Sequence, residues 1–154
     1  MIRYRRRVSA GIGPIAIAIL MILSSLSASA SDTTEEGGLS PESVAGAETI
    51  STEQAYELFR AGVPFVDVRN PRQFARRHVP GAVHLNLGSD FNLRNLQAVV
   101  AKDEPFVLYC SGRKCSRSSN AADFAVEWGF TQVKYFRDGI VGWRDAGYPM
   151  DSKQ

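Results

Sequence analysis

Both cysteines of this chain, Cys110 and Cys115, lie in one short cationic stretch. Cys110 follows the apolar run 105–109, which is typical of a buried parallel strand, and a helical pattern begins just after Arg117. The thiolate is the reactive form of cysteine, and nearby cations and a helix N-terminus both favour it. The stretch therefore predicts Cys110 as an activated nucleophile. The residues expected to cradle an anionic substrate beside it are Ser111, Gly112, Arg113, Lys114, Cys115, Ser116 and Arg117.

The second cysteine, Cys115, has two interpretations. It is either a chemical partner of Cys110 in redox or sulfur chemistry, or a small residue that packs the loop. A structural disulfide is less favoured, because a bridge across four intervening residues closes a very short loop and stabilises the fold little. The two histidines and two cysteines match no zinc-site spacing, and we expect no metal or other cofactor.

The first 30 residues predict export. Four arginines between residues 3 and 7 precede the apolar stretch 12–26, and the small residues 28–30 suit a cleavage site. The apolar stretch has 15 residues, which is short for a membrane span. We therefore expect a signal peptide at 1–30 and a periplasmic or secreted protein without stable membrane insertion after cleavage. An uncleaved N-terminal anchor that faces the periplasm is the alternative.

The rest of the chain is expected to hold one domain. Its formal charge is −2, against +2 for the whole chain, because the signal contains four of the 18 Lys and Arg and none of the 16 Asp and Glu. This balance gives no indication of nucleic-acid binding. Residues 31–46 are rich in Ser, Thr, Glu and Gly and predict a flexible linker. Residues 47–150 are then the folded domain, and 151–154 form a C-terminal tail.

Strand and helix patterns alternate through this domain. The expected strands are 65–68, 83–87, 105–109 and 133–136. Helices are expected to begin at the capping box Ser51–Gln54, to cover about 71–77, and to follow Asp138 as a short last helix. Two further helices are expected from their apolar inner faces, which consist of Leu93, Leu96 and Val100 in the first and of Ala121, Phe124, Ala125 and Trp128 in the second. The alternation predicts an α/β fold with a mainly parallel central sheet and helices on both faces. Ligands of such sheets bind beyond the carboxyl ends of the strands, where Cys110 is expected.

Three separated motifs resemble the rhodanese (sulfurtransferase) family over about residues 47–150. They are Val66-Asp67-Val68-Arg69 with the segment 77–82, then Tyr109-Cys110 with Arg117-Ser118, and finally Asp138-Gly139 with Gly147-Tyr148-Pro149. The resemblance implies a rhodanese-like fold and a persulfide on Cys110. Its partners would be a small anionic sulfur donor such as thiosulfate and an acceptor that is a thiol, cyanide or a protein cysteine. Asp67 and Arg69 are expected to support the site as a structural ion pair.

The loop departs from the usual family pattern. Six residues separate Cys110 from Arg117 instead of the usual four, and the extra length carries Cys115, as in a subset of exported rhodanese-like proteins. Attack of Cys115 on a Cys110 persulfide would release sulfide and leave a disulfide. A redox protein that uses both cysteines and a non-catalytic binding module therefore remain alternatives to the sulfurtransferase. Phosphatase or arsenate reductase chemistry is less favoured, because the loop is one residue longer than such enzymes use.

Overall fold

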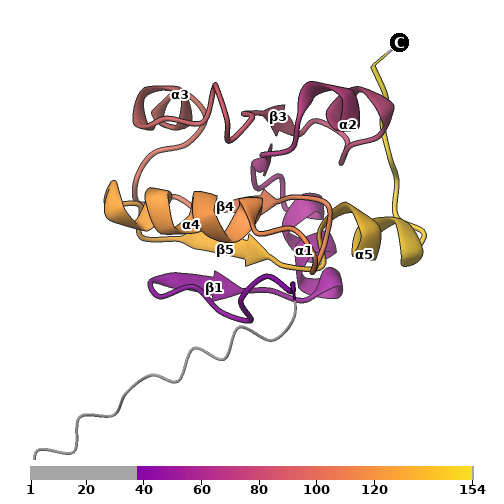
Figure 1. Cartoon of the computed structure of the whole chain (residues 1–154), viewed down its shortest axis with the longest axis horizontal. Coiled ribbons are helices and arrows are strands. Elements are labelled where there is room, and N and C mark those ends of the chain that lie inside the picture. The colour runs from indigo at the N-terminus through magenta and orange to yellow at the C-terminus, as the bar shows by residue number, and fades with distance from the viewer. Residues whose placement is uncertain (1–37, 154) are drawn as a thin grey trace, which may run out of the picture. The chain divides into compact units, whose positions relative to one another are not determined.

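A computed structural model describes residues 38–153 of the protein (Figure 1). Its strands are β1 (Ala47–Thr49), β2 (Phe65–Asp67), β3 (Val83–His84), β4 (Phe106–Tyr109) and β5 (Val133–Phe136). Its helices are α1 (Thr52–Arg60), α2 (Pro71–Arg76), α3 (Leu93–Gln97), α4 (Arg117–Glu127) and α5 (Gly139–Asp145). The expected signal peptide lies outside the described residues.

All the described strands run parallel in one sheet, in the order β1-β5-β4-β2-β3. β4 is central, and its last residue, Tyr109, pairs with Asp67 of β2 on one side and with Phe136 of β5 on the other. Neighbouring parallel strands end at the same edge of a sheet. Cys110 therefore lies at this carboxyl edge, beside the end of β2. The predicted α/β fold with a parallel sheet is confirmed.

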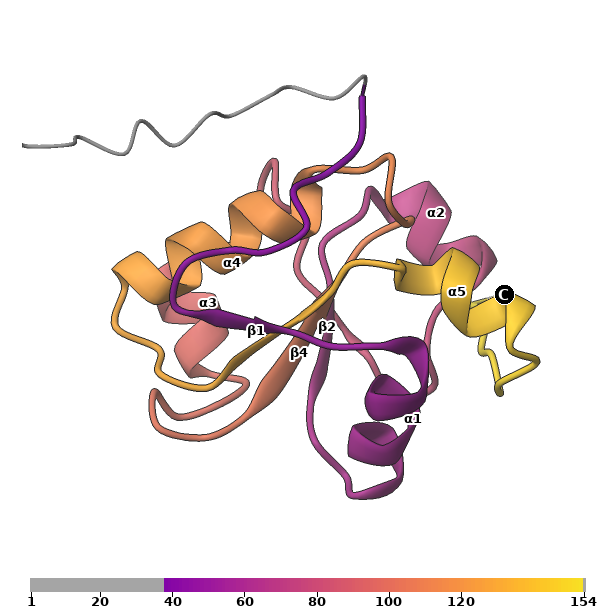
Figure 2. The same ribbon diagram turned by 90° about the horizontal axis from the view of Figure 1, so that it is seen from below.

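Helices cover both faces of the sheet, and Figure 2 shows α4 and α1 on opposite sides of the strands. The core under α4 and α3 includes Leu108 and Cys110, whereas the core under α1 and α5 includes Val107 and Tyr109. This alternation follows from the two-residue period of a strand, and it explains the unbroken apolar run of β4, which is buried on both faces. The same alternation directs the Cys110 side chain toward α4.

Local sequence signals account for two of the helix starts. The Ser51 hydroxyl accepts the Gln54 amide at 3.2 Å, and the Gln54 side chain accepts the Ser51 amide at 2.8 Å, so the predicted capping box is present at α1. At α2 the Asn70 side chain accepts the Gln73 amide at 2.9 Å, and Pro71 occupies the first helical position. These caps satisfy backbone amides at the starts of α1 and α2 that have no partner within the helix.

Several elements differ from the prediction. β1 was not predicted, because its three residues are mostly exposed and show no apolar alternation. β3 ends at His84 instead of residue 87, and α3 ends at Gln97 before Val100. Phe124 does not face the core but is 44% exposed and stacks on Trp128, because α4 buries small residues against the sheet instead. Short edge elements carry too few residues for a clear period.

In both segments that flank the expected domain, some of the described residues are packed on it. The expectation of a flexible linker is wrong for residues 40–46: Ser40 and Val44 are buried, and the Arg137 guanidinium donates to the Ser40 carbonyl at 2.6 Å. The expected C-terminal tail is paired at Asp151, which exchanges two backbone hydrogen bonds of 2.9 Å with His78. In both places backbone pairing orders a polar segment whose composition alone predicts none.

Between residues 38 and 153 we find no helix that has both the length and the apolar character needed to cross a membrane.

Candidate active site

The start of α5 supports the cysteine loop, residues 110–117, through backbone hydrogen bonds. The amides of Ile140 and Val141 donate to the carbonyls of Cys110 and Ser111, at 3.0 and 3.1 Å. Gly139 makes this approach feasible, because its φ is +56° and a Cβ at this position would overlap the Cys110 carbonyl. The first residues after β4 are therefore fixed by backbone contacts with α5.

The segment before β1 also holds the loop, through hydrogen bonds from Ser40. The amide and the hydroxyl of Ser40 both donate to the Arg113 carbonyl, at 2.6 and 3.0 Å. The segment before β1, which the sequence assigns to a linker, thus runs beside the loop. Its neighbour Leu39 is 48% exposed and contributes an apolar side chain to the rim of the site.

A cavity of about 620 Å³ opens at the loop. Its lining residues are Leu39, Ser111, Gly112, Arg113, Lys114, Cys115, Asp138, Val141 and Gly142. Five of the eight loop residues singled out in the sequence therefore share one cavity, whereas Cys110, Ser116 and Arg117 do not line it. A second cavity, of about 550 Å³, adjoins the first at Ser111 and Val141 and is lined by Arg69, Arg76, Arg77 and Arg144 among others.

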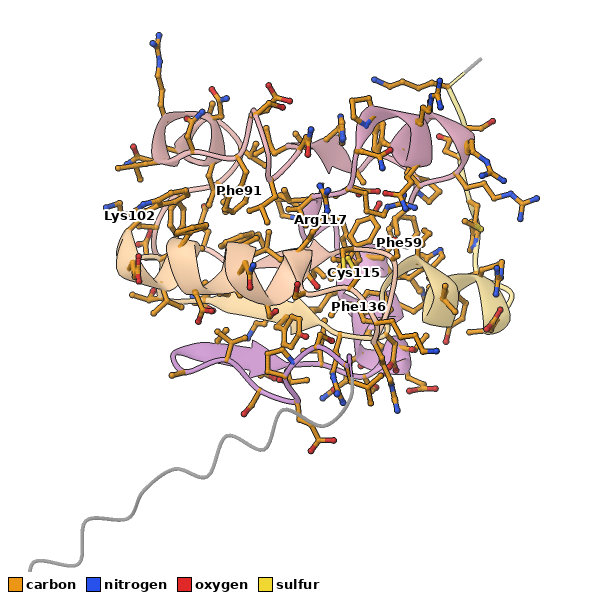
Figure 3. All side chains as sticks on the ribbon, in the orientation of Figure 1. Phe59, Phe91, Lys102, Cys115, Arg117 and Phe136 are labelled. Atoms are coloured by element: carbon orange, nitrogen blue, oxygen red, sulfur yellow. The ribbon has the colours of Figure 1, made fainter. Side chains whose placement is uncertain are left out.

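The three loop cations have different surroundings. Arg113 is 62% exposed at its side chain and pairs with Asp138 at 2.5 Å, so its charge is already countered. Arg117 donates to the Asn86 side chain at 3.2 Å and lies next to Cys115 at the start of α4 (Figure 3). Lys114 is exposed, and among residues 38–153 it has no carboxylate within 4 Å. Lys114 is therefore the loop cation best placed to meet an anion in the first cavity.

The two sulfur atoms differ in exposure and in protonation. Cys110 is fully buried, whereas Cys115 is half-buried and faces the cavity. The Cys110 thiol donates to the Cys115 carbonyl at 3.0 Å, a contact that only the protonated thiol can make. Hydrogen bonding to Cys115 and burial raise the pKa of Cys110 above its ordinary range, although the Ser118 hydroxyl opposes the shift.

Cys115 is the cysteine of the pair whose pKa is lowered. Hydrogen bonding with Cys110 lowers the pKa of Cys115 to about 5, with help from the backbone amides of Ser111 and Arg117 and from the charge of Arg117, while burial opposes the shift. An ordinary cysteine has a pKa of about 8.5. The lowered pKa that a nearby cation and a helix start favour is thus found at Cys115, whereas the assignment of Cys110 as the nucleophile stays a prediction.

Ser118 is a site residue that the sequence analysis did not select. Its hydroxyl donates to the Cys110 sulfur at 3.3 Å, and the whole residue is buried. A signal for it exists, because Ser118 lies three and four residues before Ala121 and Ala122 on the buried stripe of α4. A serine at a position that the apolar face of a helix should bury predicts a buried polar contact, which here is made with Cys110.

Asp67 and Arg69 form the expected ion pair at the end of β2. The guanidinium donates to both carboxylate oxygens, with the Nη2 contact at 2.5 Å, and both side chains are buried. Arg69 also donates to the Arg77 carbonyl at 2.7 Å. Within the described part of the chain, no three His, Cys, Asp or Glu side chains gather where a metal ion would bind.

A cysteine loop at the carboxyl edge of a parallel sheet stands where such folds bind their ligands, and cysteine is one of the side chains that can act there as a nucleophile. Residues 51–146 match the rhodanese-like domain, and this chain belongs to that family. It is 34% identical over 102 residues to the thiosulfate sulfurtransferase GlpE of Stutzerimonas stutzeri, covering 66% of this chain and 88% of that one. The family-level function that such relatives support is sulfur transfer.

Two solved structures show the same fold. The polysulfide-sulfur transferase homodimer of Wolinella succinogenes is 22% identical, with a TM-score of 0.56, over 71% of this chain and 82% of that one. A Rhodopseudomonas palustris protein of unknown function, described as a possible tyrosine phosphatase, is 31% identical, with a TM-score of 0.58, over 68% of this chain and 85% of that one. The predicted rhodanese-like fold is thus confirmed from both sequence and structure.

Proposed function

We propose that this protein moves a sulfane sulfur from a small anionic donor such as thiosulfate to a thiophilic acceptor, through a cysteine persulfide in the loop 110–117. The sequence predicts Cys110 as the carrier, and the structure adds Cys115 as a second candidate. The observation that carries the proposal is a pair of neighbouring cysteines at a cavity, one of them in its wall with a lowered pKa, in a chain whose curated relatives are named thiosulfate sulfurtransferases.

The chemistry follows from these groups. The thiolate attacks the outer sulfur of thiosulfate, a new S–S bond forms, the old S–S bond breaks, and sulfite leaves with the electron pair. Lys114 counters the charge of the approaching anion, and the backbone amides around the loop favour the negative charge of the persulfide. An acceptor thiolate or cyanide then takes the outer sulfur and returns the cysteine thiolate.

The intact mass of the reduced full chain, measured before and after thiosulfate, tests this proposal. We expect a gain of about 32 Da, one sulfur, or the product of its onward transfer to the second cysteine. Added cyanide should remove any bound sulfur and yield thiocyanate. An unchanged mass, with no sulfite released from thiosulfate or sulfur taken from polysulfide, would contradict sulfur transfer.

A thiol–disulfide redox function is the second candidate, favoured by the hydrogen-bonded pair of free cysteines. It predicts that an external disulfide oxidises the pair, whereas thiosulfate leaves its mass unchanged. Hydrolysis of an aryl phosphate would support instead the phosphatase chemistry suggested for the Rhodopseudomonas palustris protein. Sulfur transfer, thiol–disulfide exchange and phosphate hydrolysis can thus be distinguished in one set of assays, because each activity uses a different substrate.

A further inference from the structure

The second cavity beside the loop has a strongly cationic wall. Four arginines line it, and its described lining residues include no Asp or Glu. Arg69 follows β2, Arg76 and Arg77 lie at the end of α2, and Arg144 belongs to α5. Both views place α2 and α5 on the same side of the molecule (Figures 1 and 2). The cavity therefore concentrates positive charge, although the chain after the expected signal has a formal charge of −2.

Two of these four charges are available to a ligand. Arg69 is buried and paired with Asp67, and Arg144 pairs with the residue that follows it. Arg76 and Arg77, by contrast, are exposed, and in the part of the chain that the structure describes no carboxylate lies within 4 Å of either guanidinium. A guanidinium can hold a carboxylate through two parallel hydrogen bonds. These two side chains are therefore suited to acidic groups of a ligand.

The cavity also has an apolar part. Ile140, Val141 and Met150 contribute to its wall, and Val141 is 43% exposed. The cavity volume of about 550 Å³ lies in the range that accommodates an organic ligand or a few residues of a peptide. A small inorganic anion such as thiosulfate would fill little of this space and would leave the apolar wall uncovered. A peptide with both acidic and apolar side chains matches both parts of the wall.

Ser111 connects this cavity to the cysteine loop. It lines both cavities, as Val141 does, and the side-chain amide of Gln73 in α2 donates to its hydroxyl at 3.2 Å. Cys110 directly precedes Ser111 in the chain, and Cys115 lines the first cavity. A peptide that occupies the second cavity can therefore continue past Ser111 to the cysteines of the loop.

We propose that the second cavity binds an acidic segment of the protein that accepts the sulfur, next to the acceptor cysteine in that protein's chain. This inference rests on the proposed function, because it names the acceptor of that reaction. Arg76 and Arg77 hold carboxylates of the segment, and Ile140 and Met150 contact an apolar side chain of it. The acceptor cysteine then lies near Ser111, in front of the loop.

The transfer from the loop to this acceptor balances in atoms and electrons. The acceptor thiolate attacks the outer sulfur of the loop persulfide and forms a new S–S bond. The bond between the outer sulfur and the loop cysteine breaks, and its electron pair leaves this cysteine as a thiolate. The acceptor cysteine now carries the persulfide, and the step needs no external oxidant or reductant.

Fluorescence anisotropy with the full-length protein tests the binding site apart from the chemistry. The probe is a short labelled peptide that is rich in Glu, contains a Leu and has Ser in place of the acceptor cysteine; a second peptide has Gln for every Glu. We expect the Glu peptide to bind at least about tenfold more tightly than the Gln peptide, with the difference shrinking at high salt.

Two double variants locate the binding. Arg76→Gln combined with Arg77→Gln should weaken binding of the Glu peptide by about threefold or more. Arg60→Gln combined with Arg94→Gln is the matched control, because it removes two exposed charges that line neither cavity and should leave the affinity unchanged. Circular dichroism shows whether each variant is folded, and the single substitutions replace a double variant that is not.

The remaining outcomes are distinct. Equal affinity for the two peptides, or equal weakening in both double variants, would overturn the site, and tighter, competing binding of an RNA oligomer would assign it to phosphate groups. The cysteine forms of the peptides test the acceptor role: with thiosulfate as donor, the KM of the Glu peptide should be the lower one, and equal KM values would overturn that role. Retained binding of the Glu peptide without sulfur transfer even to cyanide would contradict the proposed function and leave the binding site in place.

Discussion

The carboxyl ends of β2 and β4 are neighbours in the sheet, since Asp67 pairs with Tyr109, but their polar groups differ in how they are satisfied. At the end of β2 the Asp67 carboxylate accepts the backbone amide and the guanidinium of Arg69, and both side chains are buried. At the end of β4 the Cys115 sulfur is half-buried and lines a cavity. The Asp67 carboxylate lines neither of the two cavities, although Arg69 lines the second one, whereas the Cys115 sulfur lies in the wall of the first.

This difference shows why residue type alone does not identify a catalytic group. Asp67 and Arg69 have the chemistry of an acid–base pair, but their hydrogen-bonding capacity is used by each other and by the Arg77 carbonyl. A group that reacts needs both an unsatisfied electron pair and a path for the substrate. Among the described residues at this edge of the sheet, the Cys115 sulfur combines a lowered pKa with a place in a cavity wall.

The largest effect on stability is expected at the buried ion pair of Asp67 and Arg69. Asp67→Asn leaves the buried guanidinium of Arg69 without its counterion, and the free energy of unfolding should fall by about 3–5 kcal/mol. Urea unfolding, followed by tryptophan fluorescence, measures it. Asp145→Asn is a matched control, because its ion pair with Arg144 is exposed and its loss should leave stability unchanged. Equal losses in both variants would show that burial of the Asp67 pair contributes nothing.

The pH dependence of alkylation should distinguish Cys115 from an ordinary thiol. Because the pKa of Cys115 is lowered to about 5, the rate of its reaction with iodoacetamide should be nearly constant above pH 6 and fall as the pH drops through 5. An ordinary cysteine slows by about a hundredfold between pH 8.5 and 6. The fast reaction should vanish in Cys115→Ser. A midpoint near that of a free thiol would contradict the assignment of the thiolate.

Removing Cys110, the hydrogen-bond partner of Cys115, should shift the pH dependence of Cys115 alkylation. Cys110→Ala deletes the hydrogen bond that lowers the pKa of Cys115 most, so the midpoint should rise toward the ordinary value. Ser118→Ala is the comparison, because its hydroxyl contacts Cys110 rather than Cys115 and its loss should shift the Cys115 midpoint less. If neither variant moved the midpoint, Arg117 and the backbone amides alone would account for the shift.

Gly139→Ala should loosen the support beneath the loop. The new Cβ would meet the Cys110 carbonyl and would require a φ of +56°, so we expect a loss of about 1–3 kcal/mol in unfolding free energy, together with slower sulfur loading. Gly147→Ala is a useful control, because it has a similar φ of +75° but open space around it. Slower loading in Gly147→Ala as well would show that backbone strain, and not the contact with the loop, causes the defect.

The smallest effect is expected from Arg113. Its exposed pair with Asp138 is screened by solvent, and Arg113→Ala should change the rate with thiosulfate by less than about twofold. Lys114→Ala should raise the KM for thiosulfate more than Arg113→Ala does, with the difference shrinking at high salt. A larger effect at Arg113 would mean that its pairing with Asp138 opens when the donor binds.

Much of the architecture could be read from periodicity and caps. The buried run of β4, the capping box at Ser51 and Pro71 at the start of α2 each depend on neighbouring residues, and each was predicted correctly. β1 and the packed segment around Ser40 could not be predicted in this way. Their order comes from pairing with β5 and with the Arg113 carbonyl, about 70 or more residues away in the chain.

The chemical composition of the site was present in the chain itself: two cysteines, three cations and a glycine between a strand and a helix, which suffice to predict an anion-binding thiolate loop at the edge of a parallel sheet. Which of the two cysteines has the lowered pKa was not. That choice depends on burial, on the direction of the Cys110 proton and on the amides of Ser111 and Arg117, all of which arise only when β4, α4 and α5 pack around the loop. Spacing can bring the two thiols together, but only a folded environment makes them unequal, because desolvation and hydrogen bonding act through space and not along the sequence.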